Sequence, residues 1–170
     1  QGIDWIAEFV RATRTRGLEC FWNHRVCPVD FPQPWGEGRV PHTHPSRQNW
    51  LKTRHPDWVV PCWWPQGLWN LANADCRAHK VAVLRELLVR YELDGFQLDF
   101  ARHTPCLPKG QEWQLRGEVT EFVRAVRTMS LEVEKQTGRP ILLAARVPEN
   151  ETGCRADGFD VQAWAEERLV

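Results

Sequence analysis

A single carboxylate stands at the expected end of a short strand. In the segment 93–102, Phe96, Leu98 and Phe100 alternate with Gln97 and Asp99. Side chains of a strand point to opposite faces with a period of two, so the apolar residues share one face and Asp99 lies on the other. An unpaired carboxylate is costly to bury. Asp99 is therefore expected to face a polar interior, where a carboxylate can act as a nucleophile or as an electrostatic stabiliser.

Other polar side chains are expected near Asp99, because the segments 18–26 and 141–147 also predict strands. The first run ends with Asn23 and Arg25 on one face, Arg102 follows the Asp99 strand, and Arg146 ends the third. Carboxyl ends of parallel strands meet at one edge, so the sequence predicts one carboxylate among several arginines. Neighbouring arginines favour the ionised form, which suits a nucleophile or stabiliser better than a general acid. A purely structural ion pair, or solvation of loop junctions, stays open as the alternative.

Helices are predicted before each of these strands and after the last one. Apolar residues at spacings of three and four indicate helices that begin near residues 5, 76, 115 and 161. The expected N-caps of three helices are Asp4, Asp75 and Asp160, and two helices are expected to end at Gly17 and Gly138.

The alternation of helices and strands implies a parallel sheet with helical crossovers. The near-continuous apolar run 141–147 is typical of a parallel strand that is buried on both faces. A complete (β/α)8 barrel needs roughly 250 residues, and this chain has 170. We therefore predict the α/β class, as a partial (β/α)8 TIM-type barrel of about three parallel strands with flanking helices. Residues 1–170 would form this partial domain, and the start at Gln1 suggests a cut from a longer protein.

A long segment rich in tryptophan and proline interrupts the pattern at about residues 27–73. It holds six of the ten tryptophans and is predicted to be a loop insertion. Long loops without periodicity are uncommon in compact domains unless they are functional. Trp63 and Trp64 are candidates for stacking against sugar rings. The alternative is that these tryptophans only pack a small core beneath the loop.

The residues around Asp99 also resemble a known family. The segment Tyr91–His103 is similar to the "DGxxLDFxRH" strand of bacterial glycoside-hydrolase-like (β/α)8 barrel proteins, whose families are largely uncharacterised. Further similar motifs occur in the matching order: Phe21–Arg25, His55–Trp58 and Leu143–Pro148. The chain departs from the family pattern at Cys27 and Pro28, where related sequences tend to carry a polar Asn-Asp pair.

This resemblance implies a glycoside hydrolase that acts on a poly- or oligosaccharide. Asp99 would be the catalytic or substrate-binding carboxylate, and Asn23, Arg25, Arg102 and Arg146 would line the site. The resemblance is compatible with secretion or a periplasmic location, and the compartment itself stays open. A non-catalytic carbohydrate-binding barrel is the main alternative.

Glycoside hydrolysis normally uses two carboxylates. Only Asp99 stands out at the rim, which is the edge of the predicted sheet where the three strands end near Arg25, Asp99 and Arg146. Glu149 and Glu151, on the loop after the third strand, are possible acids. The second catalytic group is more readily expected on a strand outside these 170 residues. The isolated chain is therefore expected to be inactive.

Composition and motifs argue against several other classes. Lys plus Arg equals Asp plus Glu at 22 each, so no net field attracts nucleic acid or a membrane surface. The six cysteines form no CxxC pair, which argues against a zinc ribbon or a thioredoxin-type site, and they are expected mostly as small buried residues. No cofactor or metal is predicted. The weakest alternative is a metal-dependent hydrolase, using His42 and His44 with His24 and His55. The oligomeric state stays open.

Overall fold

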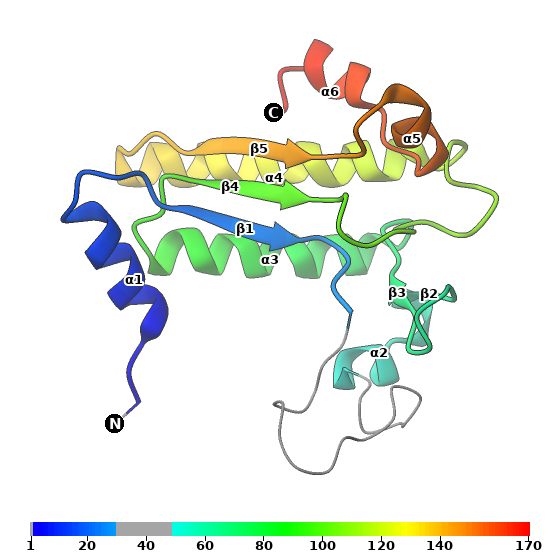
Figure 1. The fold of residues 1–170 in the computed structure, drawn as a ribbon, viewed down its shortest axis with the longest axis horizontal. Coiled ribbons are helices and arrows are strands. Elements are labelled where there is room, and N and C mark those ends of the chain that lie inside the picture. The colour runs from blue at the N-terminus through cyan, green and yellow to red at the C-terminus, as the bar shows by residue number, and fades with distance from the viewer. Residues whose placement is uncertain (1, 30–48) are drawn as a thin grey trace.

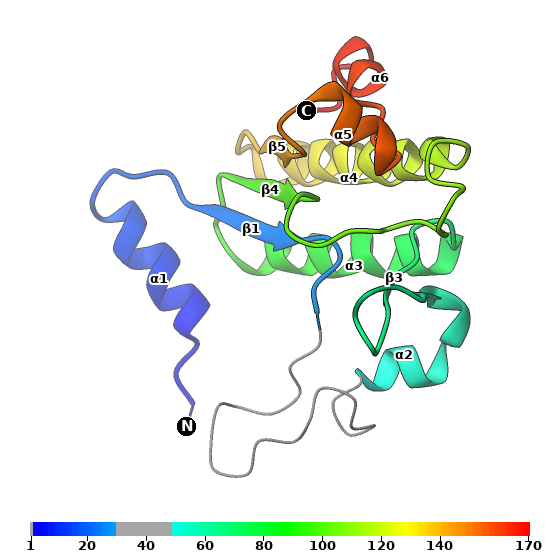
Figure 2. The ribbon, with the colours of Figure 1, turned by 45° about the vertical axis from the view of Figure 1, so that its right-hand side comes forward.

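The structure is a computed structural model that describes residues 2–29 and 49–170 (Figure 1). Its main sheet has three parallel strands in the order β1 (Phe21–Arg25), β4 (Gly95–Asp99) and β5 (Leu142–Arg146). The connecting helices α3 (Ala74–Arg90) and α4 (Arg116–Thr137) pack side by side on one face of this sheet (Figures 1 and 2). The predicted α/β class, with three parallel strands and flanking helices, is confirmed.

The winding of the sheet distinguishes it from an open doubly wound sheet. The strands lie in the order of the chain, and both crossover helices cover the same face. Doubly wound sheets place helices on both faces, whereas a (β/α) barrel places every helix outside. The arrangement is therefore that of a barrel arc, and the face without helices corresponds to the barrel interior.

The helix-covered face of the sheet forms the core. Phe96 and Leu98 of β4, and Phe100 directly after it, are completely buried. The ring of Phe100 lies 5.1 Å from that of Phe159 and 5.3 Å from that of Trp164. The period-two pattern of this strand thus places its apolar side chains where they were predicted.

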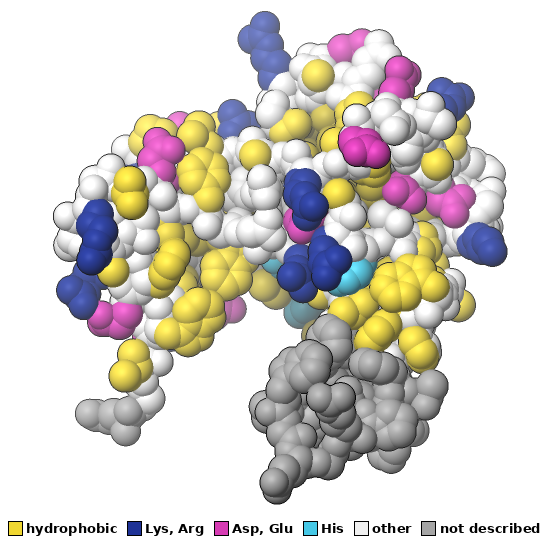
Figure 3. All heavy atoms as spheres, viewed as in Figure 1, with side chains coloured by type: hydrophobic (Ala, Val, Ile, Leu, Met, Phe, Trp, Pro, Cys, Tyr) yellow, Lys and Arg dark blue, Asp and Glu magenta, His cyan; other side chains and the backbone are white. Residues whose placement is uncertain are grey.

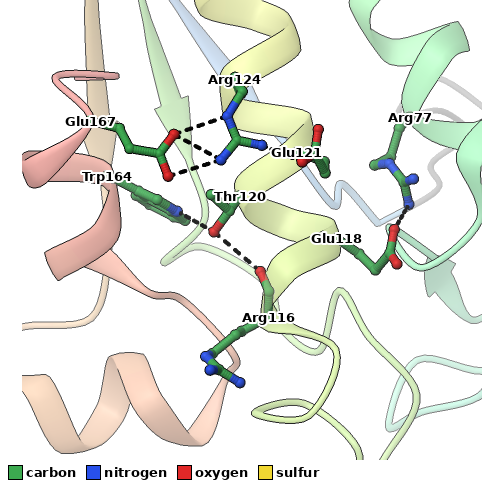
Figure 4. Close-up of polar contacts among 8 residues, drawn as sticks. All are labelled: Arg77, Arg116, Glu118, Thr120, Glu121, Arg124, Trp164 and Glu167. Atoms are coloured by element: carbon green, nitrogen blue, oxygen red, sulfur yellow. Dashed lines mark hydrogen bonds and ion pairs between the residues drawn. The ribbon is translucent and has the colours of Figure 1, made fainter.

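Polar contacts fasten α4 to its neighbours (Figure 4). The indole N–H of Trp164, in α6 (Val161–Glu166), donates to Thr120 Oγ1 at 3.0 Å. Arg124 donates to both carboxylate oxygens of Glu167, which directly follows α6. On the other side, Arg77 of α3 pairs with Glu118 at 2.7 Å. The bonds of Trp164 and Glu167 hold the segment after β5 against α4, and the Arg77–Glu118 pair joins α3 to α4.

The remaining helices lie at the two ends of the sheet. α1 (Trp5–Arg14) begins at Asp4, which accepts from the Ala7 N–H as an N-cap. α5 (Glu151–Ala156) and α6 follow β5 at the C-terminal edge, and Asp160 caps α6 as predicted. α4 ends at Gly138, whose φ of 68° is the left-handed conformation that favours glycine. No helix within the described ranges has the length and apolarity needed to cross a membrane.

Three local predictions were wrong. The first helix was expected to end at Gly17, but α1 ends at Arg14, with Thr15 as its C-cap. Asn73, not Asp75, caps α3, because its side chain accepts from the Cys76 N–H and the helix already begins at Ala74. The apolar run of β5 is not buried on both faces: Leu142 is 53% exposed, since no described element covers the open face.

The tryptophan-rich segment contains short elements in its described part. These are α2 (Trp50–Arg54), the 3-10 turn η2 (Pro56–Trp58) and the antiparallel strands β2 (Val59–Val60) and β3 (Leu68–Trp69). They lie toward the C-terminal edge of the sheet, near the N-terminal end of α3 (Figures 1 and 2). A loop insertion over about 27–73 stays a prediction, because residues 30–48 lie outside the described ranges.

Candidate functional site

Asp99 is a buried carboxylate at the C-terminal end of the central strand. Its side chain is only 4% exposed. Arg146 Nη1 donates to Oδ1 at 3.2 Å and to Oδ2 at 3.1 Å, and the backbone N–H of Arg102 donates to Oδ1 at 3.1 Å. Oδ2 therefore has fewer partners than Oδ1 among the described groups, and it is the oxygen more available to a ligand.

The register of the parallel strands explains why these groups meet. Arg25 of β1, Asp99 of β4 and Arg146 of β5 lie directly opposite one another. Because side chains alternate along a strand, all three belong to the open face. The sequence-predicted arginines at the strand ends are thus brought to the same edge as Asp99.

The open face changes character along the strands. Two residues before Arg25 and Asp99 along their strands, Asn23 Nδ2 donates to Gln97 Oε1 at 2.6 Å. At the opposite end of the strands, Gly95 lies between Phe21 and Leu142 in the register. The face is apolar at its N-terminal end and charged at its C-terminal end, so a polar ligand would bind at the charged end.

Three arginines surround the single carboxylate. Arg25, Arg102 and Arg146 are all exposed, and only Arg146 forms an ion pair within the described part of the chain. Figure 3 shows this face, with basic side chains gathered around an acidic one and a histidine beside them. Asp99 balances one of the three positive charges, which leaves the rim positive.

His103 is a rim residue that the sequence analysis did not single out. Burial lowers the pKa of its imidazole, the charges of Arg102 and Arg25 lower it further, and Asp99 opposes this. His103 is therefore neutral at neutral pH, and its imidazole is close enough to Arg25, Arg102 and Asp99 for their charges to act on it. Its place directly after Arg102 in the family-like motif was the signal that could have identified it.

Trp63 and Trp64 differ in what they offer to a ligand. Trp63 is 60% exposed, and its indole N–H donates to the carbonyl oxygen of Thr104 at 2.6 Å. Its ring centroid lies 5.9 Å from that of His103, so Trp63 stands beside the rim. Trp64 is half-buried and packs against the core with its edge toward Trp63. Of these two tryptophans, only Trp63 presents a largely exposed ring.

Other acidic residues near the ends of the strands have different surroundings. Glu149 and Glu151 are exposed and line a cavity of about 640 Å³ between the loop after β5 and α6. Asp94, at the N-terminal end of the Asp99 strand, accepts from the Cys20 N–H at 2.7 Å and from Arg14 at 2.9 Å. Asp94 is thus a structural residue that joins β4 to β1 and α1.

Of the four histidines considered for metal binding, only His24 and His55 lie within the described ranges, and their surroundings differ. His24 lies on the helix-covered face, and burial, with the charge of Lys80, lowers its pKa to about 3. His55 stacks on Trp58 with ring centroids 4.2 Å apart. His42 and His44 lie outside the described residues. Within residues 2–29 and 49–170, no group of three or more His, Cys, Asp or Glu side chains is placed to hold a metal ion.

Comparison with known proteins gives partial similarities to solved structures. No protein-family model and no curated protein matches the sequence. The structure is similar to an alpha-galactosidase from Thermus thermophilus in complex with stachyose, with a TM-score of 0.47 and 16% identity over 82% of this chain and 27% of that chain. It is also similar to the alpha-galactosidase from Lactobacillus brevis, with a TM-score of 0.46 and 14% identity over 96% of this chain and 22% of that chain. The chain thus spans about a quarter of the length of each protein, and no activity is transferred from them at these values.

Proposed function

We propose that this chain forms part of the catalytic site of a glycoside hydrolase, with Asp99 as the nucleophile or the carboxylate that stabilises the transition state. The observation that carries the proposal is the buried, arginine-paired carboxylate at the C-terminal edge of a barrel-type sheet. Active sites of such barrels lie at this edge. The resemblance of the Asp99 strand to glycoside-hydrolase-like barrels supports the same assignment.

The contacts of Asp99 suit this chemistry in two ways. The Arg146 guanidinium and the Arg102 N–H favour the charged carboxylate, which is the form that attacks an anomeric carbon or faces an oxocarbenium-like transition state. They also fix the side chain, so that Oδ2 is held in one position. The acid that protonates the leaving group must be a second carboxylate. Glu149 and Glu151 are the candidates nearest in the chain to the end of β5, and a residue outside the described ranges is the alternative.

The positive rim favours a sugar that carries a negative group. Arg25 and Arg102 form no ion pair within the described part of the chain, and a guanidinium matches a carboxylate with two parallel hydrogen bonds. An acidic oligosaccharide, such as a uronic acid oligomer, should therefore bind more tightly than its neutral counterpart. Raising the salt concentration should reduce the difference in affinity between the acidic and the neutral oligosaccharide, because salt screens the charges of exposed arginines.

The decisive experiment compares Asp99→Asn with Asp75→Asn, a matched change at an exposed carboxylate outside the site. Hydrolysis of a panel of neutral and acidic aryl glycosides is measured with the natural full-length protein. We expect Asp99→Asn to lower kcat/KM by at least about 100-fold, since a group that acts on the reacting bond is removed, and Asp75→Asn to have no effect. Equal activity of Asp99→Asn and wild type would refute the catalytic role of Asp99.

A second candidate function is carbohydrate binding without catalysis, and it is favoured by Trp63. The exposed ring of Trp63, held by its bond to Thr104, is a rigid surface on which a sugar ring can stack. In calorimetric titrations with oligosaccharides, Trp63→Ala should then abolish binding, while Trp50→Ala, at a ring of similar exposure, should not. Binding that survives Asp99→Asn, in a protein that hydrolyses no glycoside, would establish this function over the first.

A further inference from the structure

Two cysteines lie in contact beneath the rim. Cys27, two residues after the end of β1, and Cys106, in the loop after β4, are both buried. Their sulfur atoms are 2.9 Å apart. A disulfide bond is about 2.05 Å long, so the two sulfurs need to approach by less than about 1 Å to form one. The remaining cysteines have no such partner among the described residues.

The surroundings of the two thiols are unequal. Lys52 Nζ and Lys80 Nζ lie 5.2 Å and 4.9 Å from the centre of the Trp69 ring, and the carbonyl oxygen of Trp69 is 3.5 Å from Cys27 Sγ. Burial by itself would raise the pKa of the Cys27 thiol, but the hydrogen bond between Cys27 and Cys106 and the charges of Lys80 and Lys52 bring it below its ordinary value. The hydrogen bond to Cys27, together with burial, raises the pKa of Cys106 well above its ordinary value. Cys27 is thus the thiol of the pair that ionises more readily, and Cys106 is the one that keeps its proton when Cys27 ionises.

We infer that Cys27 and Cys106 form an oxidisable dithiol, which closes to a disulfide on exposure to a small peroxide and links the end of β1 to the loop after β4. The Cys27 thiolate attacks one peroxide oxygen and breaks the O–O bond, which gives a sulfenic acid and hydroxide. Cys106 then loses its proton, attacks the Cys27 sulfur, and expels the sulfenic oxygen as water. The two thiols together lose two protons and two electrons, and hydrogen peroxide takes up both and is reduced to two waters.

Closure of this disulfide would join the segment directly after β1 to the loop after β4, beneath the rim. Cys27 follows Arg25 by two residues, and Cys106 lies four residues after Arg102 and three after His103. The oxidised and reduced forms therefore differ in how firmly the first two strand ends are held together. The inference does not depend on Asp99 having any role in catalysis.

The test treats the folded protein with hydrogen peroxide and counts free thiols. We expect the number of free cysteines to fall from six to four, with a mass loss of two hydrogens and a Cys27–Cys106 peptide in a digest under non-reducing conditions. The melting temperature should rise by several degrees and return after reduction with dithiothreitol, because the bond closes a long loop of the unfolded chain.

Variants separate this pair from its neighbours. Cys27→Ser and Cys106→Ser should each prevent the crosslink, and Cys154→Ser, at a buried cysteine elsewhere, should leave it unchanged. Cys76 is also buried, and the charge of Cys27 raises the pKa of its thiol. Cys76 is therefore the alternative cysteine with which Cys27 could form a disulfide. A crosslink to Cys76, six free thiols after peroxide treatment of folded wild type, or closure that persists in Cys27→Ser would each overturn the inference.

Discussion

The ion pair between Asp99 and Arg146 makes a quantitative prediction about the free energy of unfolding. At an N–O distance of 3.1 Å, Coulomb's law with an effective dielectric constant of about 20 gives roughly 5 kcal/mol before any cost is counted. Arg146 is 53% exposed, and ordering its side chain and removing water from Asp99 oppose this attraction. We therefore expect a net coupling energy of about 1–2 kcal/mol between the two side chains.

A double-mutant cycle with Asp99→Asn and Arg146→Gln measures this coupling. Arg146→Gln leaves a buried carboxylate with the Arg102 N–H as its remaining partner among the described groups, and should cost about 2–3 kcal/mol. Asp99→Asn leaves a guanidinium that can turn to water, and should cost about 1 kcal/mol. The unfolding free energies can be obtained from urea titrations followed by the fluorescence of the tryptophans.

The matched control is the pair Arg85 and Glu132, whose side chains are 40% and 52% exposed. A coupling energy of at most about 0.5 kcal/mol is expected there, because both partners are solvated. If the Asp99–Arg146 coupling were no larger than that of the control pair, the carboxylate would not be held by Arg146. Asp99 would then not be held in a fixed position by its ion pair.

Two further predictions concern the sheet. A Cβ at Gly95 would lie 2.4 Å from the carbonyl oxygen of Leu142, so Gly95→Ala should lower the unfolding free energy by about 3 kcal/mol, whereas Gly117→Ala, with no atom within 4 Å, should raise it by about 0.5 kcal/mol. Equal effects in urea titrations would contradict this packing. His24 has a pKa of about 3 when folded and 6.5 when unfolded, so only the unfolded chain binds its proton between these values. Stability should therefore fall as pH is lowered through this window, by up to about 1.4 kcal/mol per unit, and less steeply in His24→Gln. An unchanged slope in that variant would exclude His24 as the cause.

Much of the fold followed from periodicity in the sequence. The alternation from Phe96 to Phe100 predicted which side of the central strand is buried, and three-and-four spacing predicted α4. Because neighbouring parallel strands have a fixed register, the arginines at the strand ends could be expected beside Asp99. The roles of these residues in binding or catalysis stay predictions.

Features that depend on tertiary contacts could not be predicted. Asn73 and Asp75 are both suitable caps, and only the backbone at the start of α3 decides between them. An apolar run reveals hydrophobicity but not whether another element covers it, which is why β5 was expected to be buried on both faces. The bond from Trp63 to Thr104 joins positions 41 residues apart. No local pattern in the sequence reports such a contact.

Two aspartates flank β4 and differ in their contacts: Asp94 lies directly before the strand, and Asp99 is its last residue. Asp94 joins β4 to β1 and α1 at the N-terminal end of the strand, and Asp99 lies at the rim at its C-terminal end. The two positions are about 17 Å apart, because five residues of extended chain separate them. Substitutions at the rim therefore leave the anchoring bonds of the strand intact.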